Sequence, residues 1–123
     1  MDRVAFITTQ RGDDLIVSFA VQVPDDPSEI ESLTLLRTPK YEFIFDDHER
    51  GVHVSFERHV DDEDADEFLQ RIDYVKEDGI VRIRTNLHQY ELDVSKVEKE
   101  KLRQMRKVLR KMNYDGRFYA SGV

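Results

Sequence analysis

The strongest chemical signal in this sequence of 123 residues is a run of positive charge near its end. Residues 96–111 hold eight basic and two acidic side chains, a net charge of +6, while the other 11 basic and 24 acidic residues carry −13. The eight are Lys96, Lys99, Lys101, Arg103, Arg106, Lys107, Arg110 and Lys111. Because charge of one sign on one element attracts the opposite sign, the run predicts a binding surface.

The candidate binding residues are Arg103, Arg106, Lys107, Arg110 and Lys111, with Arg117 and Tyr119 from the following tail. Arginine holds phosphate groups and aromatic rings stack on bases, as in proteins that bind single-stranded nucleic acids. The same basic side chains could instead contact a protein partner or the protein's own acidic loops, with their aliphatic stems covering apolar surface. The residues alone leave these three uses open.

Histidine and carboxylate side chains are the next candidates, as metal ligands. His53 and His59 are six residues apart, so in an extended strand they share one face, but a third ligand must come from elsewhere. The acidic residues 61–67 include no glycine, which a calcium-binding EF-hand loop requires. We therefore predict no metal site and no cofactor.

Catalytic motifs are missing from the chain. It has no cysteine, no nucleophile elbow of the Gly-x-Ser-x-Gly type and no glycine-rich phosphate loop. We predict no catalytic residue and favour a protein that is not an enzyme. A small-molecule or metal-dependent enzyme is kept as an alternative.

Length and composition predict a single globular domain over residues 1–123. The chain is 39% hydrophobic and 37% charged, and its net charge of −7 argues against a general nucleic-acid binder. The absence of cysteine, of a basic-apolar leader and of a long apolar run favours a cytoplasmic location without membrane contact. Unpaired sheet edges make a homodimer plausible.

Alternating apolar residues predict most of residues 3–94 to be strands. The clearest alternation covers residues 15–23, which should form a hairpin with residues 4–9. After a break at 24–28 and a turn, we expect a strand at 33–37. A second hairpin is predicted from 41–45 and 52–56, and a third from 72–76 and 80–85 around the turn Asp78-Gly79. A further strand is expected at 87–94.

Two segments carry helical patterns. Ala65, Phe68, Leu69 and Ile72 follow helical spacing, so a short helix is predicted at about 64–70, before the strand at 72–76. Residues 95–112 form the second predicted helix, with Ser95 and Glu98 as a capping box. Its apolar stripe comprises Val97, Leu102, Met105, Val108, Leu109 and Met112.

Together these elements predict an α+β fold, with an antiparallel β-meander or partial barrel of about six to eight strands. An amphipathic basic helix (95–112) and a short tail (113–123) would complete it. For function, the sequence favours a small acidic cytoplasmic protein that acts as an interaction or regulatory module through charged surfaces. Its expected partner is another protein. The alternative partner is a nucleic acid or nucleotide bound by the basic helix.

Overall fold

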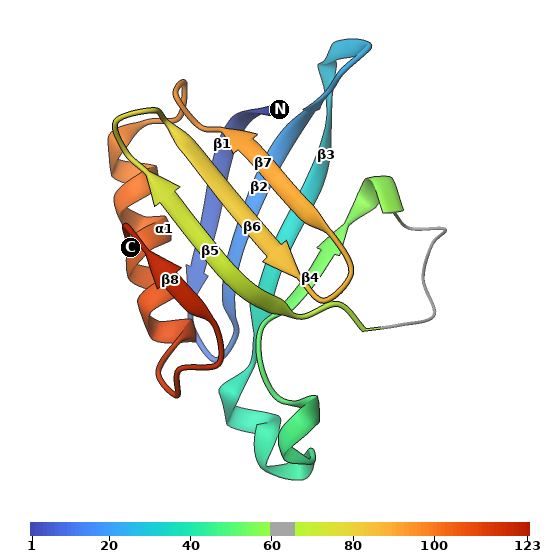
Figure 1. Cartoon of the computed structure of the whole chain (residues 1–123), viewed down its shortest axis with the longest axis vertical. Helices are drawn as coiled ribbons and strands as arrows, with labels where there is room; N and C mark the ends of the chain where they lie inside the picture. Colours follow the sequence, from blue (N-terminus) through green and yellow to red (C-terminus); the bar gives the residue numbers. More distant parts are fainter. Residues whose placement is uncertain (60–65) are drawn as a thin grey trace.

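The computed structural model describes residues 1–59 and 66–123. Over these residues the chain forms eight strands and one α-helix (Figure 1). In order these are β1 (Asp2–Arg11), β2 (Leu15–Val23), β3 (Asp26–Arg37), β4 (His53–Phe56), β5 (Leu69–Val75), β6 (Ile80–Thr85), β7 (Gln89–Asp93), α1 (Lys99–Met112) and β8 (Tyr119–Ser121). Three short 3₁₀ helices, η1 (Pro39–Ile44), η2 (Asp47–Glu49) and η3 (Glu57–His59), flank β4. The chain is thus α+β, and none of its described helices is long and apolar enough to cross a membrane.

The strands form one sheet in the order β4-β3-β2-β1-β7-β6-β5-β8. Two of its pairs are parallel, β1 with β7 and β5 with β8, so the prediction of a purely antiparallel sheet was wrong. The second pair follows from the helix: α1 carries the chain across before β8, and such crossovers allow parallel pairing. The alternation of apolar residues within a strand does not show that the chain returns to pair β8 with β5.

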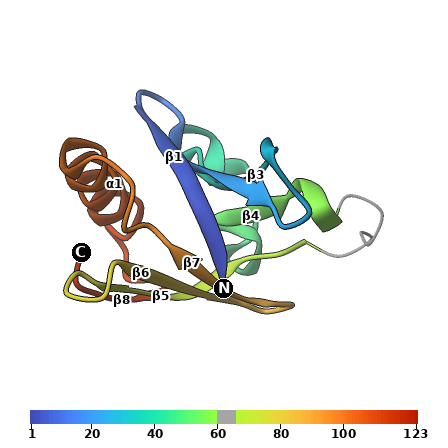
Figure 2. The ribbon, with the colours of Figure 1, turned by 90° about the horizontal axis from the view of Figure 1, so that it is seen from above.

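The sheet bends into two half-sheets, β1–β4 and β5–β8, which meet where β1 and β7 pair over only two residues each. Figure 2 shows the two half-sheets at an angle, with α1 beside β1 within that angle. The buried side chains of both half-sheets and of α1 form one apolar core. Met105, Val108, Leu109 and Met112 are the helix residues buried there.

Two of the three hairpins predicted from alternating apolar residues are confirmed. Strands β1 and β2 form the predicted hairpin, with Thr9 opposite Val17, and β5 and β6 form the predicted hairpin around Gly79. Strand β3 begins at Asp26, so the expected break at 24–28 is shorter than predicted.

The predicted hairpin of 41–45 with 52–56 is not formed. Residues 39–44 are the 3₁₀ helix η1, which begins at Pro39, and β4 pairs with β3 instead, placing Val54 opposite Leu35. Proline has no backbone N–H for a strand ladder, while the N–H of Tyr41 donates to the carbonyl of Thr38. These two facts favour a turn over a strand.

The helix expected at 64–70 is also not formed where the structure describes it. Residues 64 and 65 lie outside the described ranges, Asp66 and Glu67 are not helical, and Leu69 starts β5. The backbone of this segment is hydrogen-bonded to residues 52–54, at the start of β4: Val54 N donates to Glu67 O at 2.8 Å and Leu69 N donates to Val52 O at 2.9 Å. Pairing with a distant strand overrides the local helical pattern.

The final helix is found, but it begins at Lys99 rather than at Ser95. Its N-cap is Glu98, which makes no side-chain capping bond, so the predicted capping box was wrong. The Ser95 hydroxyl donates to Asp93 at 2.6 Å, which holds Ser95 in a turn. Residues 119–121 of the expected tail form β8 against β5.

Candidate functional site

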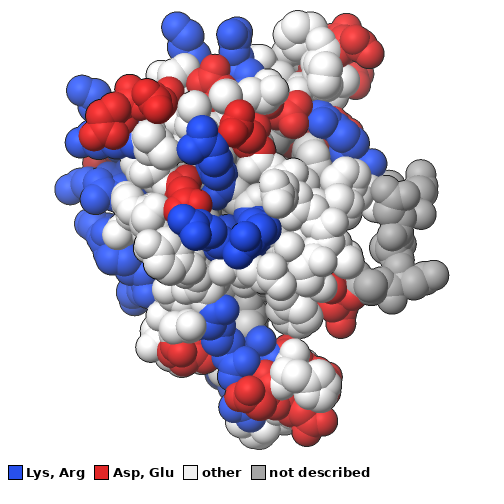
Figure 3. All heavy atoms as spheres, in the orientation of Figure 1, with Lys and Arg blue, Asp and Glu red and all other residues white. Residues whose placement is uncertain are grey.

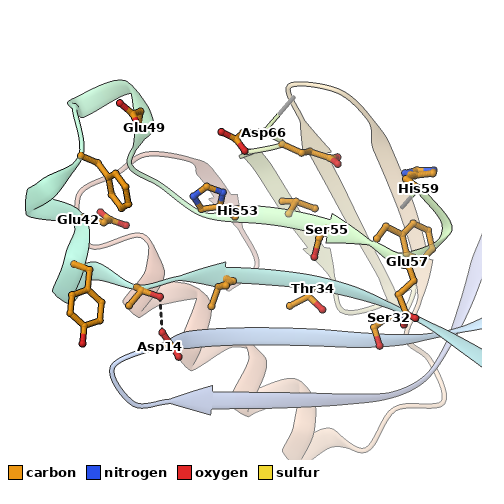
Figure 4. A pocket seen from close by; sticks show the side chains of 17 residues that line it. Asp14, Ser32, Thr34, Glu42, Glu49, His53, Ser55, Glu57, His59 and Asp66 are labelled. Carbon is orange, nitrogen blue, oxygen red and sulfur yellow. Dashed lines mark hydrogen bonds between the residues drawn. The ribbon is translucent and has the colours of Figure 1, made fainter. Parts of the chain in front are cut away.

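A groove of about 1000 Å³ crosses β3 and β4 (Figure 4). Its part on β3 lies on the sheet face that points away from the core, because side chains alternate along each strand. On β3, Leu33 and Leu35 are buried in the core, while Ser32 and Thr34 line the groove. Ser55 of β4 is opposite Thr34 and lines the groove as well.

Acidic side chains dominate the charge of this groove. Its described lining residues include no lysine or arginine, and they include an apolar part from Leu36, Tyr41 and Phe45, next to the core residues Val54 and Phe56. Among the described residues, the carboxylates that line it are six: Asp14, Glu42, Glu49, Glu57, Asp66 and Glu67. A cavity lined by one sign of charge concentrates ligands of the opposite sign. We call this site the acidic groove.

Glu42 belongs to a buried ion-pair network that fixes one wall of the acidic groove. The side chain of Arg37 is fully buried and donates to both carboxylate oxygens of Glu42, at 2.8 and 2.9 Å. It also donates to both oxygens of Asp115, at 2.8 Å each, and to the carbonyl of Met112 at 2.7 Å. Arg37 thereby joins η1 to the end of α1.

The carboxylates of this network are held in the ionised form. Hydrogen bonds from Arg37 are the largest cause that lowers the pKa of Asp115 far below its ordinary value. Burial alone would raise the pKa of Glu42, but the hydrogen bonds and charge of Arg37 outweigh burial and lower it.

Glu67 is engaged at the opposite wall of the groove. One of its oxygens accepts hydrogen bonds from Thr85 at 2.6 Å and Tyr90 at 2.7 Å, and lies 3.2 Å from Nδ1 of His88. Burial, followed by the hydrogen bond and charge of Glu67, raises the pKa of Tyr90 well above its usual value. The ring of His59 stacks on His88 at 4.2 Å and closes this end of the groove.

The other four carboxylates can still accept a cation. Asp14 accepts a hydrogen bond from the Thr38 hydroxyl, and Glu57 accepts one from the backbone of Ser32. Within the described ranges, neither these two nor Glu49 and Asp66 forms an ion pair with lysine or arginine. The groove therefore offers negative charge that the protein does not neutralise itself.

The basic residues predicted on the helix lie on α1. Figure 3 shows Lys and Arg side chains along the edge of the molecule where α1 lies. Arg103, Arg110 and Lys111 are exposed, and Arg106 and Lys107 are half-buried. Arg103, Lys107 and Arg110 follow i, i+4, i+7 spacing and so share one helix face.

The two predicted tail residues are engaged away from α1. The guanidinium of Arg117 binds Asp115 at 2.8 Å and Asp47 at 2.6 Å, joining the tail to η2. The ring of Tyr119 lies on β8 under the guanidinium of Arg71, 4.5 Å away. Neither residue joins the basic face of the helix.

The two histidines considered as metal ligands do not share a strand face, because β4 ends at Phe56 and His59 belongs to η3. The ring of His53 packs against Phe68 instead. Among the described residues one group, Asp46, His48 and Glu49, brings three ligand atoms within 4.8 Å, and all three residues are exposed.

Sequence reasoning missed the acidic groove. Its one visible signal was the polar alternation of His53, Ser55 and Glu57, which marks an outward strand face but not a cavity. Comparisons of the chain with protein-family models, curated proteins and solved structures found no match. The function is therefore argued from the groove and the charged surfaces.

Proposed function

We propose that this protein is a binding module, without catalytic activity, that holds a basic segment of a protein partner in the acidic groove. One observation carries the proposal: the described residues that line a groove of about 1000 Å³ include six carboxylates and apolar side chains but no lysine or arginine. Lysine and arginine combine a charged end with an apolar stem, so a segment rich in them matches both parts of this lining.

The hydrogen bonds of the groove favour binding over catalysis. A catalytic serine or threonine needs a base within hydrogen-bond reach. The Thr38 hydroxyl donates to the carboxylate of Asp14 at 2.7 Å, but in the described part of the chain no hydroxyl of the groove is hydrogen-bonded to a histidine that would complete a nucleophile–base pair. Its Ser and Thr hydroxyls can instead bind the backbone of an extended segment.

The test is fluorescence anisotropy with a labelled peptide in which Lys or Arg alternates with Leu. The groove variant Glu49→Lys/Asp66→Lys should weaken binding at least about tenfold, because it places like charges against the peptide. Both positions are exposed, so the fold should be unaffected.

A matched control is Glu29→Lys/Glu77→Lys, which makes the same change in net charge at exposed positions outside the groove. It should bind the peptide nearly as well as the wild type, since distant surface charges are screened by salt. Equal weakening by both variants would show that net charge, not the groove, attracts the peptide, and the proposal would fail.

A further inference from the structure

Among the described residues, no other element forms an ion pair with the basic face of α1. Lys99, Lys101, Arg103, Arg110 and Lys111 are exposed. Within residues 1–59 and 66–123, one ion pair includes a basic residue of α1, and it joins Arg103 to Glu100 of the same helix at 2.7 Å. No ion pair among the described residues joins the helix to an acidic loop, and the acidic residues 61–64 lie outside the described ranges.

The basic helix and the acidic groove lie on opposite faces of the half-sheet β1–β4. Helix α1 contributes its buried residues to the core that also holds Leu33 and Leu35 of β3. The groove is lined by the intervening residues Ser32 and Thr34, which point the other way. A helix packed on the core face cannot reach the groove of its own molecule.

We propose that the basic segment held by the acidic groove is the face of α1 from a second copy of this chain. This inference rests on the proposed function of the groove and names its occupant. Arg103, Lys107 and Arg110 of one molecule contact Asp14, Glu49, Glu57 and Asp66 of the next. The stems of the basic side chains cover the apolar part around Tyr41 and Phe45.

Such an interface joins two different surfaces, so a pair keeps one free groove at one end and one free helix at the other. Head-to-tail contacts of this kind extend into rings or open chains rather than stopping at a symmetric dimer. The contact is largely between exposed charges, and it should therefore weaken as salt rises.

The experiment is sedimentation velocity at ionic strengths of about 10 mM and about 1 M, where charges are screened beyond about 30 Å and about 3 Å. The wild type should form species larger than a dimer as its concentration rises at low ionic strength, and should be monomeric at high ionic strength.

Two variants separate the two surfaces. The groove variant Glu49→Lys/Asp66→Lys and the helix variant Arg103→Gln/Lys107→Gln/Arg110→Gln should each be monomeric. Glutamine forms helices well, so the helix variant should stay folded. An equimolar mixture should form a 1:1 heterodimer and nothing larger, because one intact helix meets one intact groove.

Each other outcome contradicts a distinct statement. A wild type that is monomeric at low ionic strength but still binds the basic peptide in its groove overturns the self-association and leaves the proposed function standing. A wild type that neither self-associates nor binds the basic peptide overturns both the self-association and the proposed function. Salt-sensitive binding of a random oligonucleotide that the helix variant loses, without self-association of the wild type, assigns α1 to phosphate instead and also overturns the inference.

Discussion

At the scale of single residues, Arg37 decides how β3, η1 and α1 are held together. Its side chain has no exposed area, yet its guanidinium donates to two carboxylates and a backbone carbonyl and lies 4.4 Å from the ring of Tyr114. A buried charge is tolerated only when it is paired and hydrogen-bonded, and Arg37 meets both conditions. The wall of the acidic groove at η1 therefore depends on this residue.

Removal of Arg37 should strongly destabilise the fold. We expect Arg37→Met to lower the free energy of unfolding by about 3–5 kcal/mol, because Glu42 is left as a buried charge without its partner. The double variant Arg37→Met/Glu42→Leu should recover part of the loss, since both buried charges are then absent.

Urea unfolding at pH 7, followed by circular dichroism, measures both effects. The control is Arg82→Met, which breaks an exposed pair with Glu91 and should leave stability near that of the wild type. A loss below about 1 kcal/mol for Arg37→Met would show that the network contributes little.

The same network predicts how stability depends on pH. The pKa values of Asp115 and Glu42 are lowered in the folded state, so in acid the unfolded chain binds more protons than the folded one. Stability from these groups is complete above their unfolded pKa values of about 4 and is lost as pH falls toward the folded values.

Asp115→Asn should therefore unfold with a shallower dependence on pH below about 4 than the wild type, as measured by urea unfolding across the acid range. Asp13→Asn is the control, because the ion pair of Asp13 with Lys40 is exposed on both sides. The network would not carry the acid sensitivity if both variants followed the pH profile of the wild type.

At the scale of elements, β8 shows how one residue can fix the position of a strand. Gly122 follows β8 with φ of +75°, and a Cβ atom at this position would overlap the carbonyl oxygen of Tyr74. Gly116 also has positive φ, +70°, but a Cβ there would have open space around it. The two glycines therefore separate the cost of the left-handed conformation from the cost of a clash.

We expect Gly122→Ala to destabilise the protein clearly more than Gly116→Ala, whose cost should be about 1–2 kcal/mol for the left-handed conformation alone. In Gly122→Ala the amides of β8 should also exchange faster with solvent, because the strand must move away from β5. Urea unfolding and hydrogen exchange measure the two effects. An equal loss of unfolding free energy in the two variants would show that a Cβ atom at position 122 meets no clash.

The elements that sequence patterns predicted correctly are those whose partners are adjacent in the chain. Hairpins β1–β2 and β5–β6 have strong alternation and short turns, so their local signals agree with the final pairing. Residues 41–45 alternate just as well, yet β4 pairs with β3 instead, across residues 38–52. Likewise, the helical spacing at 64–70 is overridden by hydrogen bonds between residues 67–69 and residues 52–54.

At the scale of the whole molecule, the two charged surfaces differ in how far they could be predicted. The basic face of α1 comes from one continuous run, so its residues were found by counting charges. The acidic groove draws its residues from five segments, at 14, 32–38, 41–49, 53–59 and 66–67, and it requires the β3–β4 pairing that alternation did not reveal. The carboxylates were visible in the sequence, but their convergence depends on tertiary structure.

The opposite charges on the two faces also predict how thermal stability responds to protein concentration. Association that requires the folded state stabilises that state by mass action, as a ligand does. Raising the concentration about a hundredfold at about 10 mM ionic strength should therefore raise the melting temperature of the wild type by a few degrees. At about 1 M ionic strength the melting temperature should not change, because screening removes the contact.

Differential scanning calorimetry measures this shift, and the helix variant Arg103→Gln/Lys107→Gln/Arg110→Gln is its control. This variant keeps the buried stripe of α1 and its own groove, but it lacks the charges that would enter the next molecule. Its melting temperature should be independent of concentration at both ionic strengths. A wild type that is equally independent would mean that the two faces do not meet, and that the positive charge of α1 serves a different partner.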